Sequence, residues 1–191
     1  YHIFMKQKKT RKQAFDDYLE VVEAAWEADI RPRCHLEDVT RADIEGFVLP
    51  FVTELMRRSE QVAPEMRAKV RLCDTMGFGI STPGVALPRS IPKLIYRMTN
   101  DAGVPPECLE WHGHNDFHKV HINGSSSWLY GCNAVNATAL GFGERTGNPP
   151  LEGAIMEYVA LKGELCGIDM SAITEIADYM RSIGTEIAPN Y

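Results

Sequence analysis

The chain has 191 residues, of which 45% are hydrophobic and 24% are charged, and this composition is typical of a globular domain with a sizeable core. The net charge of −6 argues against a nucleic-acid-binding surface. No apolar run reaches the roughly 18 residues that a membrane-spanning helix needs. Five scattered cysteines without a C-x-x-C pair favour reduced thiols, so we expect a cytoplasmic location.

Apolar periodicity predicts strands and helices that alternate along the chain. The expected strands span residues 1–5, 31–36, 68–73, 109–112 and 137–142. The expected helices span residues 11–28, 42–61, 88–100, 120–132, 151–162 and 171–183. This alternation predicts βα units around a parallel sheet.

Polar residues follow every expected strand, beginning with His2 and ending with residues 144–148. In a (β/α)8 barrel the active site lies at the carboxyl end of all strands, whereas a flat doubly wound sheet concentrates its site at one switch point. The pattern therefore favours the barrel. Because a full barrel needs about 250 residues, we predict the α/β class and a partial (β/α)8 TIM barrel.

The most informative motif is Trp111-His112-Gly113-His114-Asn115-Asp116 at the end of an expected strand. Residues two apart on a strand point to the same face, so His112 and His114 can present two imidazoles to one metal ion. Asn148, in a later glycine-punctuated loop, is a candidate third ligand. A lone His-x-His is more often a surface or core pair, but the strand end and the second polar loop favour a metal site here. Such ligands suit Zn, Mn or Mg.

Four motifs carry a family resemblance: residues 37–41, 74–77, 112–116 and 143–148. Together they resemble the acyl-CoA:2-oxo-acid synthases, which include 2-isopropylmalate, homocitrate, citramalate and Re-citrate synthases. These belong to the metal-dependent TIM-barrel superfamily of HMG-CoA lyase. The residues after His114 and Asn148 look most like the Re-citrate branch, whose 2-oxo acid is oxaloacetate.

The resemblance implies a role for each matching residue. His112, His114 and Asn148 match metal ligands or a residue beside the metal, and Glu37 matches a catalytic residue near the reacting carbons. The residues that match substrate contacts are His2, Thr75, Glu144 and Arg145. Two structural alternatives stay open: Glu37 pairing with Arg41, and Glu144 with Arg145 merely fixing their loop.

The resemblance further implies a fragment that covers about strands 3–8 of the barrel with their helices. Residues 1–165 would form the catalytic barrel, and residues 166–191 a helical extension that leads to a missing subdomain. The implied reaction is a Claisen condensation of acetyl-CoA with a 2-oxo acid on a divalent metal, followed by thioester hydrolysis. The implied partners are these small molecules, without nucleic acid or membrane, and a second copy in a homodimer. An HMG-CoA-type lyase and a non-catalytic barrel fragment are the alternatives.

Overall fold

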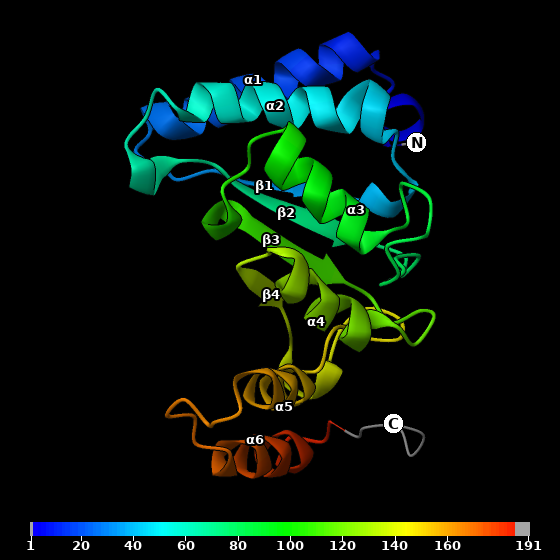
Figure 1. Ribbon diagram of the computed structural model, residues 1–191, viewed down its shortest axis with the longest axis vertical. Coiled ribbons are helices and arrows are strands. Elements are labelled where there is room, and N and C mark those ends of the chain that lie inside the picture. Colours follow the sequence, from blue (N-terminus) through cyan, green and yellow to red (C-terminus); the bar gives the residue numbers. More distant parts are fainter. Residues whose placement is uncertain (1, 186–191) are drawn as a thin grey trace.

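The computed structural model describes residues 2–185 and shows four parallel strands in the order β1-β2-β3-β4 (Figure 1). The strands are β1 (Arg33–Leu36), β2 (Lys69–Asp74), β3 (Leu109–Gly113) and β4 (Ala134–Asn136). Each strand pairs with the next one in the chain, and the connection between them contains a helix or helices. The sheet is therefore one part of the wall of a (β/α) barrel.

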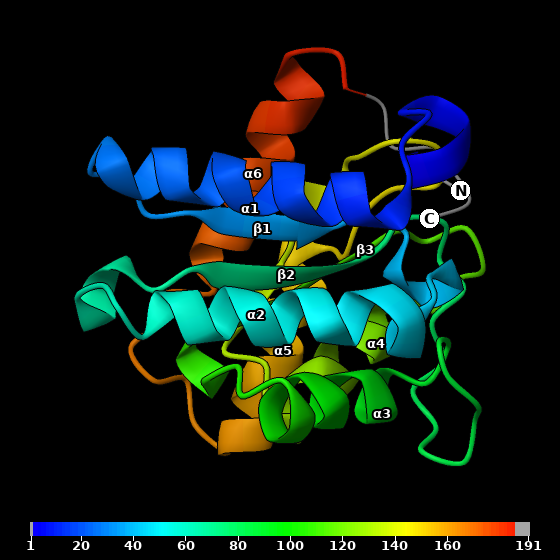
Figure 2. The ribbon, with the colours of Figure 1, turned by 90° about the horizontal axis from the view of Figure 1, so that it is seen from above.

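The helices that accompany the sheet were predicted well from the sequence. They are α1 (Arg11–Glu27), α2 (Leu49–Ser59), α3 (Ile91–Tyr96), α4 (Val120–Tyr130), α5 (Leu151–Lys162) and α6 (Ser171–Ser182). Thr10 begins α1 with a capping box, in which its hydroxyl accepts from the Gln13 amide and the Gln13 side chain accepts from the Thr10 amide. Figure 1 shows α1 and α2 above the sheet, Figure 2 shows α1 next to β1 and α2 next to β2, and Phe15 of α1 packs edge-on against Phe51 of α2.

The sheet has one apolar and one polar face because side chains alternate along each strand. Val70 and Leu72 of β2, with Leu109 and Trp111 of β3, are completely buried in the core beneath the helices. The intervening residues point to the opposite face, which is the interior of the barrel. These are Arg33 and His35 of β1, Lys69, Arg71 and Cys73 of β2, and Glu110 and His112 of β3.

Two of the five strands expected from periodicity are wrong. The described residues form a four-stranded sheet, and not the six strands that the family resemblance implies for strands 3–8. Residues His2–Lys6 form a π-helical turn, and Tyr1 lies outside the described residues. The last strand is Ala134–Asn136, whereas residues 139–141 form a 3-10 turn in which Leu140 is left-handed, with φ of 55°. The apolar run 137–142 was misleading because its glycine-rich part bends sharply, while the half-buried β4 gives only a weak apolar signal.

Candidate metal centre and substrate site

The carboxyl ends of the strands carry the polar residues of the candidate site. Glu37 follows β1, Asp74 ends β2 and Asn136 ends β4, while His112 lies next to the end of β3. Because the strands are parallel, these residues lie along one edge of the sheet. In the register of the sheet, His112 lies between Cys73 on β2 and Asn136 on β4.

His112 and His114 converge at this edge. Their Nε2 atoms are 3.2 Å apart, and the two ring planes are nearly perpendicular, at 89°. The Nδ1 atom of His112 lies 2.8 Å from the side-chain oxygen of Asn136. Donation from Nδ1 to that oxygen leaves the lone pair on Nε2, which is the tautomer that binds a metal through Nε2. Burial lowers the pKa of His112, so its imidazole is neutral at pH 7.

This geometry fits a divalent cation. Metal–nitrogen bonds of about 2.1 Å place neighbouring ligand atoms about 3.0–3.4 Å apart, and the two Nε2 atoms have this spacing. His114 is buried, and its Nδ1 has no hydrogen-bond partner among the described residues. A cation would use the lone pairs of both imidazoles, so the two predicted histidine ligands lie in an arrangement suited to their role.

Asn148 lies directly beside the histidine pair. Its Nδ2 donates to the carbonyl oxygen of Gly113, between the two histidines, at 2.9 Å. Asn148 is 7% exposed, and its Oδ1 lies against Gly143, where an added Cβ would come within 1.9 Å of that oxygen. Glycine at position 143 is therefore what leaves room for the Asn148 amide. Because Nδ2 is used by Gly113, Oδ1 is the atom available to a cation.

Glu37 is held by the loop after β2. The Thr75 hydroxyl donates to Glu37 Oε2 at 2.9 Å and accepts from the Asp38 amide at 2.8 Å. Thr75 therefore fixes the carboxylate at the carboxyl end of β1. Arg41 donates two short hydrogen bonds to Asp38, at 2.8 and 2.6 Å, so among residues 2–185 its ion pair is with the neighbouring acid and not with the Glu37 considered from the sequence.

Arg145 connects two loops at the mouth of the site. Its guanidinium donates to both carboxylate oxygens of Asp116, at 2.7 and 2.9 Å, and to the carbonyl oxygen of Thr75 at 2.6 Å. The Glu144 side chain is 77% exposed and lies 3.6 Å from Arg145. These contacts correspond to the loop-fixing interpretation of this pair. A direct contact with substrate stays a prediction.

His2 reaches the site from outside the sheet. It lies in the π-helical turn, and its Nε2 is 3.9 Å from Asp38 Oδ2 beyond the end of β1. The expected strand position of His2 is thus replaced by a turn, although the side chain still lies beside the Glu37–Asp38 segment. A contact between His2 and the substrate stays a prediction.

Sequence reasoning missed three polar residues of this region: Asn136, Asp116 and the thiol-bearing Cys73. Asn136 was missed because β4 was placed too late in the chain. The sequence signal for Asp116 was its position in the His-x-His motif, and its partner Arg145 lies 29 residues further along the chain. Cys73 ends an expected apolar strand and carries no motif of its own; it is buried, and it lies on the polar face of the sheet, beside His112 on the neighbouring strand.

A parallel βα wall with two convergent histidines at a strand end is the arrangement expected of a metal-dependent barrel domain. The model of the HMGL-like family matches residues 1–180, and the chain belongs to this family. Among residues 2–185, no helix is both long and apolar enough to cross a membrane.

Two citrate synthases are similar to the chain. It is 54% identical to the Citrate (Re)-synthase of Syntrophus aciditrophicus over 100% of its own length, and 50% identical to that of Clostridium kluyveri over 94%. The match covers only 30% and 39% of these two proteins, so the chain spans about a third of the length of the curated relatives. The 2-phosphinomethylmalate synthase of Streptomyces hygroscopicus is 38% identical over 100% of the chain and 43% of that protein.

Solved structures support the barrel fold. Hydroxymethylglutaryl-CoA lyase from Pseudomonas aeruginosa matches 92% of the chain and 57% of its own, with a TM-score of 0.64 and 23% identity. An HMG-CoA lyase from Acinetobacter baumannii, solved with coenzyme A and 3-methylmalate, matches 95% of the chain and 57% of its own, with a TM-score of 0.65 and 18% identity. At these identities the likeness concerns the fold alone.

Proposed function

We propose that the protein condenses acetyl-CoA with a 2-oxo acid, most consistently oxaloacetate, and then hydrolyses the thioester. The observation that carries the proposal is the convergent pair of His112 and His114 in a chain 54% identical to a Citrate (Re)-synthase. The same histidine pair supports divalent-metal dependence. Because the chain covers a third of its relatives, the reaction is assigned to the protein made from the complete reading frame.

The proposed mechanism divides the work among the strand ends. His112, His114 and the Asn148 oxygen would hold the divalent ion, which supplies Lewis-acid activation of the keto group when bound. Asn136 keeps the His112 imidazole in the tautomer that presents Nε2. Mg and Mn are as compatible with these nitrogen and oxygen ligands as Zn, so the donor set does not choose among them.

Glu37 is the proposed proton-transfer group. Its carboxylate is half-exposed at the mouth of the sheet and is oriented by the Thr75 hydroxyl. A carboxylate held in this way can take a proton from the acetyl methyl group at Oε1, while Oε2 keeps its hydrogen bond to Thr75. Arg145 and Asp116 hold the Thr75 loop and so position Glu37 indirectly. His2 and Glu144 are the proposed contacts with the substrate at the rim of the site.

The test is the release of free CoA from acetyl-CoA by the protein from the complete reading frame, in Mn²⁺ or Mg²⁺. Oxaloacetate, 2-oxoglutarate, 2-oxoisovalerate and pyruvate are supplied separately, and we expect release with oxaloacetate. Release with a branched 2-oxo acid would keep the synthase chemistry but overturn the choice of substrate. Absence of release with all four, together with cleavage of HMG-CoA, would replace the proposal with a lyase.

A further inference from the structure

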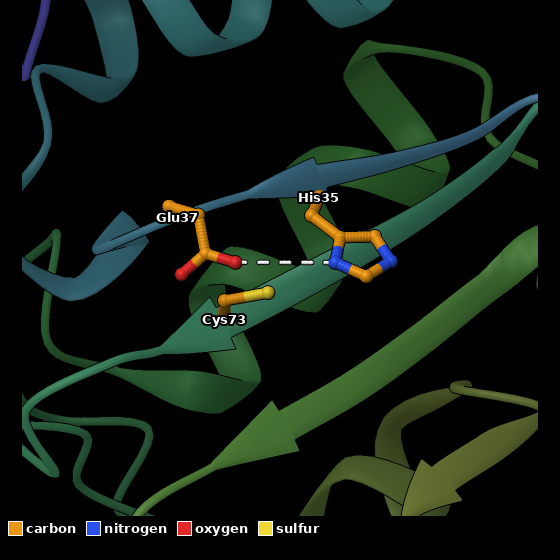
Figure 3. A group of neighbouring side chains, drawn as sticks. All are labelled: His35, Glu37 and Cys73. Atoms are coloured by element: carbon orange, nitrogen blue, oxygen red, sulfur yellow. Dashed lines mark ion pairs between the residues drawn. The ribbon is translucent and has the colours of Figure 1, made fainter.

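Three different metal-binding side chains meet on the barrel face of β1 and β2, outside the histidine pair described above. They are His35, Glu37 and Cys73 (Figure 3). One ligand atom from each lies within 4.8 Å of the other two, and His35 Nδ1 is 3.9 Å from Glu37 Oε1. Figure 3 shows the imidazole, the carboxylate and the sulfur on the same face of the sheet.

The strand geometry explains this convergence. His35 and Glu37 are two residues apart along β1 and its extension, so they share a face. The pairing of Leu36 with Leu72 places Cys73 of β2 alongside Glu37. The three side chains are therefore brought together by sheet register and not by a flexible loop.

The donor set is one that favours a thiophilic cation. An imidazole nitrogen, a carboxylate oxygen and a sulfur are typical ligands of Zn²⁺, with bonds of about 2.0–2.3 Å. Such bonds separate ligand atoms by about 3–4 Å, so only small rotations are needed to close the group around an ion. His35 and Glu37 are exposed, which gives an ion access from solvent, while Cys73 is buried beneath them.

Cys73 does not have the surroundings of a reactive thiol. Burial raises the pKa of its thiol, and the neighbouring Glu37 carboxylate raises it further. A thiol in such surroundings is protonated and a poor nucleophile, whereas a bound metal ion removes the proton and takes the thiolate as a ligand. The sheet register that places Cys73 beside His35 and Glu37, and not its pKa, is what indicates metal binding here.

We propose that His35, Glu37 and Cys73 form a second cation site, selective for Zn²⁺ and similar thiophilic ions, and that its occupation inhibits the protein. Glu37 is common to this site and to the proposed proton transfer. A bound ion would occupy Glu37 Oε1, the atom nearest His35, and so block the proposed proton acceptor. The inhibitory half of this inference rests on the proposed function, whereas the binding half does not.

The binding half is tested with Co²⁺ as a spectroscopic substitute for Zn²⁺ in the protein from the complete reading frame. Coordination by a thiolate produces an intense near-ultraviolet charge-transfer band, which nitrogen and oxygen ligands do not produce. We expect the band in the unchanged protein and its loss in Cys73→Ser. Cys34→Ser is the matched control, because Cys34 lies on the neighbouring strand but points to the apolar face, and it should keep the band.

Two further variants separate the new site from the histidine pair. His35→Ala should lower the Co²⁺ affinity, measured from the charge-transfer band, by at least tenfold. The double variant His112→Ala/His114→Ala should keep the band. A band that survives Cys73→Ser, or is absent from the unchanged protein, overturns the proposal. So does a band that depends on His112 and His114 but not on His35, because Cys73 would then belong to their site.

The inhibitory half is tested by adding Zn²⁺ to CoA release assayed in saturating Mn²⁺. With each activity expressed relative to the same variant without Zn²⁺, we expect Cys73→Ser to need at least ten times more Zn²⁺ for half inhibition than Cys34→Ser. Equal sensitivity of the two variants overturns the inhibitory role. The Co²⁺ band is measured without substrate, so a failure of the proposed reaction would not change its outcome.

Discussion

Single side chains determine how the candidate metal centre is held. Asn136 is the clearest case, because its amide oxygen fixes the His112 ring from the neighbouring strand at 2.8 Å. Groups that orient a metal-ligating histidine commonly contribute 10–100-fold to metal affinity. We therefore expect Asn136, which sequence reasoning missed, to support metal binding by His112.

The Asn136→Ala variant should bind Mn²⁺ about 10–100-fold more weakly than the unchanged protein. The reason is that His112 loses the partner that fixes its tautomer and ring orientation. Asn133→Ala is the matched control, because Asn133 is exposed and lies just before β4. Isothermal titration with Mn²⁺ measures both affinities, and equal affinities for the two variants would show that Asn136 has no such role.

Gly143 makes a second prediction at the scale of one residue. A methyl group there would meet the Asn148 oxygen at 1.9 Å, so Gly143→Ala should displace the amide. If Asn148 supplies an oxygen ligand, the Mn²⁺ affinity should fall by about tenfold or more, because disturbing the orientation of a metal ligand commonly has an effect of this size. Gly84→Ala is the control, because nothing lies within 4 Å of an added Cβ. Titration curves that coincide for the two variants would remove Asn148 from the ligand set.

The strands themselves are held together on their barrel face by an ion network. The Glu110 side chain of β3 is 4% exposed and contacts Lys69 at 3.0 Å and Arg71 at 2.8 Å on β2, and Arg33 at 3.2 Å on β1. One carboxylate thus links three strands below the site. Removing it would leave partly buried cations without their counter-charge. Breaking a buried ion pair in this way commonly lowers the free energy of unfolding by about 3–5 kcal/mol.

Glu110→Gln should therefore lower the free energy of unfolding by about 3–5 kcal/mol at pH 7, while the exposed Glu107→Gln changes it little. Burial opposes ionisation of Glu110, but hydrogen bonds from Lys69 and Arg71 outweigh it and hold its pKa below the ordinary 4.5. Because folding lowers this pKa, the ionised Glu110 carboxylate stabilises the fold fully at pH values above the ordinary pKa. This stabilisation is lost as the pH falls through the pKa of the folded state. Denaturant unfolding from pH 7 to 3 should show the two variants converging. A difference that stays constant would exclude this contribution.

At the scale of the whole molecule, the repetitive parts were predictable from sequence. Apolar periodicity located α5 at residues 151–162 as observed, and placed β1, β2 and β3 within a few residues. The strands β2 and β3 were predictable because they bury apolar side chains completely, whereas α5 buries only Ala154 and β1 is only partly buried. The alternation of strands and helices then leads directly to a parallel barrel wall.

The rest depended on contacts that sequence periodicity does not contain. Residues 137–142 are apolar but turn at Leu140 and Gly141, and the short β4 is only half-buried. The convergence of His112 and His114 was predictable, because it follows from spacing on one strand. The contacts of Asp116 with Arg145 and of Glu37 with Cys73 join distant segments, so they appear only when the strands are in register.

The role of the histidine pair is tested by measuring Mn²⁺ binding and CoA release in parallel for the double variant His112→Ala/His114→Ala. Both measurements use the protein from the complete reading frame with acetyl-CoA and oxaloacetate, and unfolding experiments confirm that the variant is folded. We expect high-affinity Mn²⁺ binding and CoA release to be lost together. A folded double variant that binds Mn²⁺ and releases CoA as the unchanged protein does would contradict this role.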